Sequence, residues 1–245
     1  MEVALQSQQK PMPELIVEQI SRTEKDRVTL HEISFSMRKG EKIGLMGETG
    51  SGKTTLLKII AGLIQPTTGS VIYQDKRVKG PDEVLLPGHP HIGYLSQHFE
   101  LLNNYYIEEI LDMHNKTSDE GARHLYKLCK IDHLLRRRTN ELSGGERQRI
   151  SLAKTLISNP SLLLLDEPFS NLDGINKKII HQVLADIFKG TPLTCIMVSH
   201  NPNELLSWAE SLMILKEGKL IQMDETQAVQ SDPINSYVAQ IIGKE

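Results

Sequence analysis

A glycine-rich run at residues 47–55 carries the clearest chemistry in this sequence. It reads GETGSGKTT and fits the pattern G-x-x-x-x-G-K-[ST]. Glycines let successive backbone N–H groups point inward around a phosphate, while Lys53 reaches the β- and γ-phosphates and the Thr54 hydroxyl reaches Mg²⁺. Apolar stretches at 43–46 and 56–60 flank the run, which indicates a strand, a loop and a helix whose N-terminus attracts anions. The sequence therefore predicts a nucleoside triphosphate site rather than a surface turn. The predicted nucleotide-binding residues are Gly47, Glu48, Thr49, Gly50, Ser51, Gly52, Lys53, Thr54 and Thr55.

Two adjacent carboxylates follow the apolar run Leu162–Leu165. Such a run predicts a buried strand, and in open parallel sheets ligands bind at the carboxyl ends of strands. Asp166 is then placed to hold Mg²⁺, directly or through water, and Glu167 to take a proton from an attacking water. The alternative is an acidic turn, but the presence of the phosphate loop favours a hydrolytic site.

A second pair of glycines lies in the segment 142–148, LSGGERQ. Ser143 can cap a helix, and Gly144 and Gly145 leave backbone N–H groups bare at its N-terminus, which makes another anion site. One chain with two such helix starts allows two interpretations. Either it binds two anions, or each start contributes half of a pocket shared across a dimer.

The arrangement of apolar residues predicts the elements that position these groups. Alternation over Leu15–Ile20 and Val28–Met37 indicates antiparallel strands, and alternating strands and helices after residue 140 indicate a parallel sheet. We expect an α/β fold: a P-loop NTPase core with a mainly parallel sheet, an N-terminal antiparallel β subdomain and an inserted α-helical subdomain. The expected parts are a polar tail at 1–13 and one domain at 14–245, with the helical insertion at about 99–158 and short strands and a helix at about 211–245.

Composition limits the class of protein. Of the 245 residues, 39% are hydrophobic and 24% charged, and the net charge of −3 offers no basic surface for nucleic acid. Cys129 and Cys195 have no metal-binding or redox spacing, as expected in a reducing compartment. The longest apolar run is far shorter than the about 20 residues that span a bilayer, and the N-terminus has no apolar signal core. We therefore expect a cytosolic protein.

In order and spacing, these motifs resemble the ATP-binding-cassette (ABC) ATPase family from about Leu15 to Lys216. The resemblance implies two cassettes packed head-to-tail, with the signature segment of one touching the γ-phosphate of ATP held by the other. It also implies that Gln97 contacts Mg²⁺ and the attacking water and that His200 bonds the γ-phosphate, although each alone could be a polar strand end or a helix cap. The implied signature residues are Leu142, Ser143, Gly144, Gly145, Glu146 and Gln148, and those of the dimer-interface loop are Asn171, Leu172 and Asp173.

The family resemblance further implies a role in transport. The expected partners are a second ABC ATPase subunit, identical or paralogous, and transmembrane permease subunits that hold the chain on the inner face of the membrane. The stretch 224–239 resembles the end of the cassette in importers, for which a substrate-binding protein is a further expected partner. The alternative is a soluble ABC ATPase acting on nucleic acid or ribosomes, which the short insertion and acidic balance disfavour. The transported substrate is not selected by this chain.

One departure concerns the adenine base. The family usually places an aromatic ring near the position of Glu24, and the segment Leu15–Ile33 has none. The planar guanidinium of Arg22 is one substitute, and a loosely held base is the other. Asn171 replaces a frequent alanine. We interpret the run 136–138 as a solvated face, and no metal is expected at the histidines between residues 89 and 98.

Overall fold

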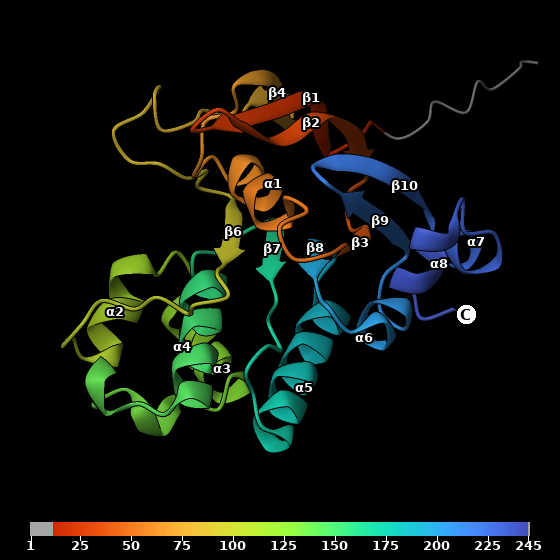
Figure 1. Cartoon of the computed structure of the whole chain (residues 1–245). Coiled ribbons are helices and arrows are strands. Elements are labelled where there is room, and N and C mark those ends of the chain that lie inside the picture. Colours follow the sequence, from red (N-terminus) through yellow and green to blue (C-terminus); the bar gives the residue numbers. More distant parts are fainter. Residues whose placement is uncertain (1–11, 245) are drawn as a thin grey trace, which may run out of the picture.

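Two β-sheets carry the fold (Figure 1), in a computed structural model that describes residues 12–244. Most of the predicted polar tail, residues 1–13, lies outside the described residues. The smaller sheet has the order β2-β1-β4-β5 and the larger one β10-β9-β3-β8-β7-β6. The strands are β1 (Leu15–Glu24), β2 (Arg27–Met37), β3 (Lys42–Met46), β4 (Thr68–Tyr73), β5 (Lys76–Arg77), β6 (Ile92–Leu95), β7 (Leu162–Asp166), β8 (Thr194–Val198), β9 (Ser211–Lys216) and β10 (Lys219–Glu225).

The smaller sheet is antiparallel throughout, which confirms the expectation for the N-terminal strands. Leu15 and Val17 of β1 are fully buried toward the larger sheet. Glu18, on the opposite face of the strand, is exposed. This alternation follows from the period of two of a β-strand, which sends successive side chains to opposite faces. The pattern therefore fixes which face of the sheet covers the core.

The larger sheet is mainly parallel, with one antiparallel pair at its edge, β9 and β10. Its strand β7 is buried on both faces. Leu162 and Leu164 pack in the core shared with the smaller sheet, and Leu163 and Leu165 pack in the core on the opposite, helical face. Because each fully buried leucine contributes about 1.5–3 kcal/mol, this strand anchors both cores.

Helix α1 lies between the two sheets, and the remaining helices lie on the other side of the larger sheet or at its end (Figure 1). Between β6 and β7, where the sequence predicts an inserted helical subdomain, the chain forms α2, α3, two 3-10 turns and α4. The predicted α/β fold is confirmed. The helices are α1 (Lys53–Ile60), α2 (Ile107–His114), α3 (Asp119–Leu128), α4 (Gly144–Ile157), α5 (Gly174–Gly190), α6 (Pro202–Leu206), α7 (Thr226–Ser231) and α8 (Ser236–Ile241).

The parallel pairing brings four strand ends to one edge of the larger sheet. Strands β3, β6, β7 and β8 run in the same direction, so the residues that follow them gather there although they are far apart in the sequence. The residues just beyond these ends are Gly47, Gln97, Glu167 and His200. Among the helices of residues 12–244, none is long and apolar enough to cross a membrane.

Candidate active site

Two glycines of the phosphate loop (residues 47–55) have backbone conformations that other residues adopt only with strain. Gly47 has a φ of 151°, and a Cβ there would lie 2.2 Å from the carbonyl oxygen of Leu215. Gly52 has a φ of 99° at the start of α1, where a Cβ would lie 2.6 Å from the Leu30 side chain. The loop therefore passes so close to β2 and β9 that only glycine fits.

The N-terminus of α1 is open. Its N-cap Gly52 provides no side-chain hydrogen bond, and its first turn holds no acidic residue. A helix start leaves its first N–H groups without intrahelical partners and carries a partial positive charge. The first N–H groups of α1 are therefore available to bind an anion.

Lys53 is buried in the loop that it follows. Its ammonium group donates hydrogen bonds of 2.8 Å to the carbonyl oxygens of both Gly47 and Glu48. Burial lowers the pKa of Lys53, and the nearby charges of Glu167, Asp166 and Glu48 oppose that shift. The ammonium is thus held beneath the loop, beside the carboxylates at the end of β7.

A cavity of about 690 Å³ opens above the phosphate loop. Its volume lies within the range of small-molecule sites, about 300–1,000 Å³. The cavity joins eight residues of the loop to three polar residues from the ends of β6, β7 and β8. Its lining is Arg27, Val28, Thr29, His31, Glu48, Thr49, Gly50, Ser51, Gly52, Lys53, Thr54, Thr55, Gln97, Glu167, His200, Glu217 and Lys219.

The three residues predicted to be catalytic meet directly in this cavity. One Glu167 carboxylate oxygen accepts a hydrogen bond of 3.0 Å from the Gln97 amide, and the other lies 2.6 Å from Nε2 of His200. Glu167 has a φ of 54°, a left-handed conformation that costs energy for a residue other than glycine. The backbone N–H of Glu167 donates to Val198 at the end of β8, which helps to hold this conformation.

Asp166 has an unpaired oxygen that suits a cation. The side chain is 1% exposed; Oδ2 accepts a hydrogen bond of 2.9 Å from the Tyr94 hydroxyl, while Oδ1 has no partner among the described residues. Leaving a buried carboxylate oxygen unpaired costs free energy that a bound cation would recover. Thr54 and Gln97 add oxygen atoms in the cavity lining, and Mg²⁺ prefers such ligands. The residues present therefore fit Mg²⁺.

The sequence did not single out Tyr94. Burial raises the pKa of its hydroxyl, with a further contribution from Asp166. The hydroxyl is therefore protonated and donates to the carboxylate. Only the position of Tyr94 within the strand before Gln97 could have indicated this contact.

The signature segment Leu142–Gln148 lies outside this cavity. Ser143 caps α4 by accepting from the N–H of Glu146, and the Glu146 carboxylate accepts from the N–H of Ser143 at 2.8 Å. Gln148 is fully buried and donates to the carbonyl of Pro168. In contrast, Ser143 and Gly144 are exposed. These two residues are free to contact another molecule.

The dimer-interface loop also lies outside the cavity. Asn171 and Asp173 are exposed, and Leu172 is half-buried. Asp173 caps α5 by accepting from the N–H groups of Ile175 and Asn176, and hydrogen bonds from Asn176 lower the pKa of Asp173. The loop is thus anchored at its end while its exposed face remains available.

Arg22, the predicted substitute for an adenine-stacking ring, does not line the cavity. Its guanidinium donates to the carbonyl of Gln65 at 2.9 Å and to Glu24. Arg27 and Val28, the first two residues of β2, line the cavity instead. On the far side, the Tyr237 hydroxyl accepts from the N–H of Glu48. No sequence signal connects a residue of α8 to the phosphate loop.

One family model and several known proteins match this chain in sequence. The family model described as ABC transporter matches residues 30–170. The glucose import ATP-binding protein GlcV of Saccharolobus solfataricus is 33% identical over 243 residues, which cover 95% of the chain and 69% of that protein. The molybdate/tungstate import ATP-binding protein WtpC of Pyrococcus horikoshii is 35% identical over 238 residues, covering 94% and 68% respectively.

A solved structure shares the fold. It is the dimeric post-hydrolysis state of an ATP-binding cassette bound to ADP and Pi, with a TM-score of 0.75 and 24% sequence identity. The match covers 86% of the chain and 98% of that structure. At this identity the likeness supports the arrangement of sheets and helices described above.

Proposed function

This chain belongs to the ABC transporter family, and on that premise we propose that it is the ATP-binding and ATP-hydrolysing subunit of an importer. Relatives at 33–35% identity are named as import proteins for glucose, Fe(3+) ions and molybdate or tungstate. None of them is named for nucleic acid or ribosomes, so transport is favoured over that alternative. The cargoes of these relatives differ, and no cargo is assigned to this chain.

The observation that carries the proposal is the position of Glu167 between Gln97 and His200. In the proposed reaction, Glu167 accepts the proton of a water that attacks the γ-phosphate, and Gln97 orients that water. His200 donates a hydrogen bond to the γ-phosphate, for which it must leave its contact with Glu167. Thr54, Asp166 and Gln97 would hold Mg²⁺, which neutralises charge on the phosphates when bound.

We propose that a second copy or a paralogue completes the site. The signature segment lies outside the chain's own cavity, and its Ser143 and Gly144 are exposed at a helix start, where anions bind. In a head-to-tail dimer these groups would close on the γ-phosphate held by the partner. Asn171–Asp173 would then cross the interface between the two subunits.

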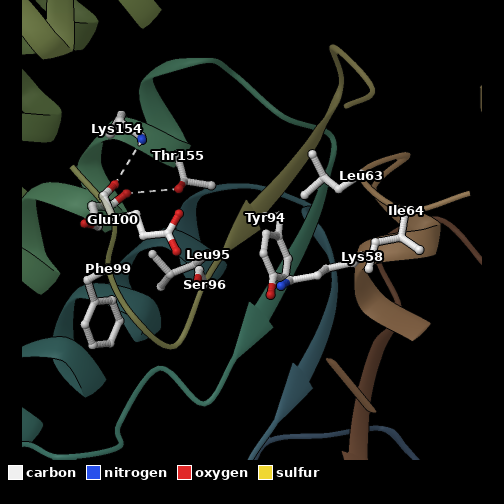
Figure 2. A pocket seen from close by; sticks show the side chains of 11 residues that line it. Lys58, Leu63, Ile64, Tyr94, Leu95, Ser96, Phe99, Glu100, Lys154 and Thr155 are labelled. Carbon is white, nitrogen blue, oxygen red and sulfur yellow. Dashed lines mark hydrogen bonds between the residues drawn. The ribbon is translucent and has the colours of Figure 1, made fainter. Parts of the chain in front are cut away.

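The permease subunits need a docking surface, for which we propose a second cavity, of about 340 Å³ (Figure 2). It lies between the end of α1, strand β6 and helix α4, and it opens beside Phe99 and Glu100, just after Gln97. The loop before β6 is joined to the end of α1 beside this cavity by the hydrogen bond from the Gly88 N–H to the Gly62 carbonyl. It leaves Leu85 and Leu86 exposed, as a protein contact would use. Figure 2 shows the lining: Lys58, Leu63, Ile64, Tyr94, Leu95, Ser96, Phe99, Glu100, Lys154 and Thr155, together with Ser151.

This surface would let a membrane subunit influence hydrolysis. Tyr94 lines the docking cavity and donates to Asp166, and Gln97 holds Glu167. An occupant that shifted β6 or the segment after it would therefore move both contacts. Binding there would hold the chain on the inner face of the membrane, opposite any substrate-binding protein.

The substitution Glu167→Gln tests the catalytic assignment. It removes the base but keeps the size and polarity of the side chain, so ATP binding should persist while turnover falls by about 100-fold or more. ATP should then trap a dimer, measurable by size-exclusion chromatography with light scattering. Glu225→Gln, on an exposed residue outside the cavity, is the control. Unchanged turnover in the Glu167→Gln variant would contradict the assignment.

A further inference from the structure

A buried carboxylate supports the loop that carries His200. Glu204 belongs to the short helix α6, and its side chain is 7% exposed. It accepts hydrogen bonds from the Ser199 hydroxyl and, at 3.3 Å, from the Asn201 amide. Since these two residues flank His200, Glu204 holds the loop on both sides of the residue that faces the cavity.

The same carboxylate forms an ion pair with Lys177 of α5. Lys177 lies in the first turn of that helix, four residues after its N-cap Asp173. Its backbone N–H donates to the Asp173 carbonyl at 3.0 Å. The ion pair therefore connects the His200 loop to the end of the dimer-interface loop.

The other side of this helical turn contacts the start of α4. Asn176 donates to an Asp173 carboxylate oxygen at 2.7 Å and accepts from Arg149 of α4 at 2.9 Å. A Cβ at Gly145 would lie 2.3 Å from the Asn176 side chain. The signature segment thus packs directly against Asn176, the neighbour of Lys177.

These contacts form one continuous network. It runs from Gly145 and Arg149 through Asn176 and Asp173 to the first turn of α5, and from Lys177 through Glu204 to the loop around His200. Glu204 is nearly inaccessible, so removing Lys177 would leave a buried charge without its ionic partner. Because solvent cannot replace Lys177 at this carboxylate, a shift of α5 would move the loop as well.

We propose that the Lys177–Glu204 pair positions His200 in response to the second subunit. The inference rests on the function proposed above. Contact of the partner with Ser143, Gly144 and the dimer-interface loop sets the position of α5, and the ion pair passes that position to the loop carrying His200. Lys177 and Glu204 are positioning residues, since neither touches the reacting phosphate.

The test uses the full chain and a matched pair of lysines. Lys177→Met removes the ion pair, Lys177→Arg keeps it, and Lys178→Met changes the adjacent exposed lysine. For Lys177→Met we expect kcat to fall by about tenfold, with KM and ATP affinity changed by less than about twofold. Lys177→Arg should restore kcat, and Lys178→Met should match the wild type. A role limited to folding would not give this separation of kcat from KM.

Hydrogen–deuterium exchange provides a readout that does not depend on turnover. Lys177→Met should increase exchange in peptides covering residues 198–208, and Lys178→Met should not.

A double variant tests whether the two residues act through one contact. The kcat of Lys177→Met/Glu204→Gln should be no lower than that of the slower single variant, because both changes break the same contact.

Equal kcat and equal exchange in the Lys177→Met and Lys178→Met variants would overturn the inference. Parallel losses of kcat and ATP affinity would overturn it as well. Either result would leave the proposed function standing, provided that Glu167→Gln still lowers turnover by about 100-fold or more. Conversely, normal turnover with Glu167→Gln would contradict the proposed function, and the exchange measurement would still decide whether Lys177 supports the loop.

Discussion

The two glycine-rich helix starts of this chain, those of α1 and α4, differ in how their exposed backbone groups are satisfied. At α1 the N-cap is Gly52, which has no side chain to bond the first N–H groups, and the first turn has no acidic residue. At α4 the N-cap is Ser143, whose hydroxyl accepts from the N–H of Glu146. The Glu146 carboxylate in turn accepts from the N–H of Ser143.

This difference fits two helix starts that would contact different nucleotides in the proposed dimer. The α1 start is left open and faces the chain's own cavity, so it can bind phosphate within one subunit. The α4 start is stabilised by its own capping box and lies outside that cavity. The start of α4 can therefore be folded before a partner subunit brings an anion to it.

The largest expected effect follows from Lys53→Ala at the first start. Lys53 is buried at the loop and is predicted to bond the phosphates, and a charge-assisted hydrogen bond is worth about 1.5–3 kcal/mol. Affinity for ATP should fall by roughly 100-fold, measured by titration with a fluorescent ATP analogue. Lys189→Ala, on an exposed lysine, serves as the control. Full affinity in the Lys53→Ala variant would place the nucleotide elsewhere.

A smaller effect is expected from Ser143→Ala, for which Ser118→Ala is a matched control. Each serine is exposed and caps a helix by accepting from the N–H three residues later. Each change should lower the free energy of unfolding by about 1 kcal/mol, measured by chemical denaturation. Only Ser143→Ala should also reduce ATP hydrolysis, with ATP binding to the single subunit retained. Equal hydrolysis by the two variants would remove the distinction between these caps.

The smallest effect concerns pH and Glu146. The hydrogen bond from the Ser143 backbone is the main cause that lowers the pKa of this carboxyl below its ordinary 4.5. The unfolded chain therefore takes up the proton first, so the stabilisation is complete above pH 4.5 and disappears as the pH falls through the folded pKa. Glu146→Gln should reduce this acid-dependent loss by about 0.3–1 kcal/mol in denaturation at pH 3.5 to 7. An unchanged pH profile would show that the carboxylate does not stabilise α4.

Much of the fold could be predicted because local patterns determine it. The leucines of β7 predict a strand buried on both faces, and the glycine-rich loop with its flanking apolar stretches predicts β3 and α1. Boundaries were less accurate. The strand predicted at Leu15–Ile20 continues to Glu24 in the structure, because its later residues still pair with β2.

The site was only partly predictable, since some of its contacts depend on tertiary packing. Gln97, Glu167 and His200 each follow a strand, and the structure brings them into contact. The contacts of Tyr94 with Asp166 and of Tyr237 with Glu48 join residues 72 and 189 positions apart, and no local pattern indicates them. The catalytic and signature roles remain predictions until they are measured.

Mixing two inactive variants tests the shared site most directly. Lys53→Ala disables the phosphate loop, and Ser143→Arg blocks the signature segment with a bulky charge. In a head-to-tail dimer of one chain of each kind, the intact loop of one faces the intact signature of the other. In an equal mixture about half of the dimers contain one chain of each kind, and one of the two sites in such a dimer is intact. The mixture should therefore recover roughly a quarter of wild-type ATPase activity, although each variant alone is inactive. Two folded variants that stay inactive when mixed, or a Ser143→Arg variant that hydrolyses ATP normally alone, would contradict the account.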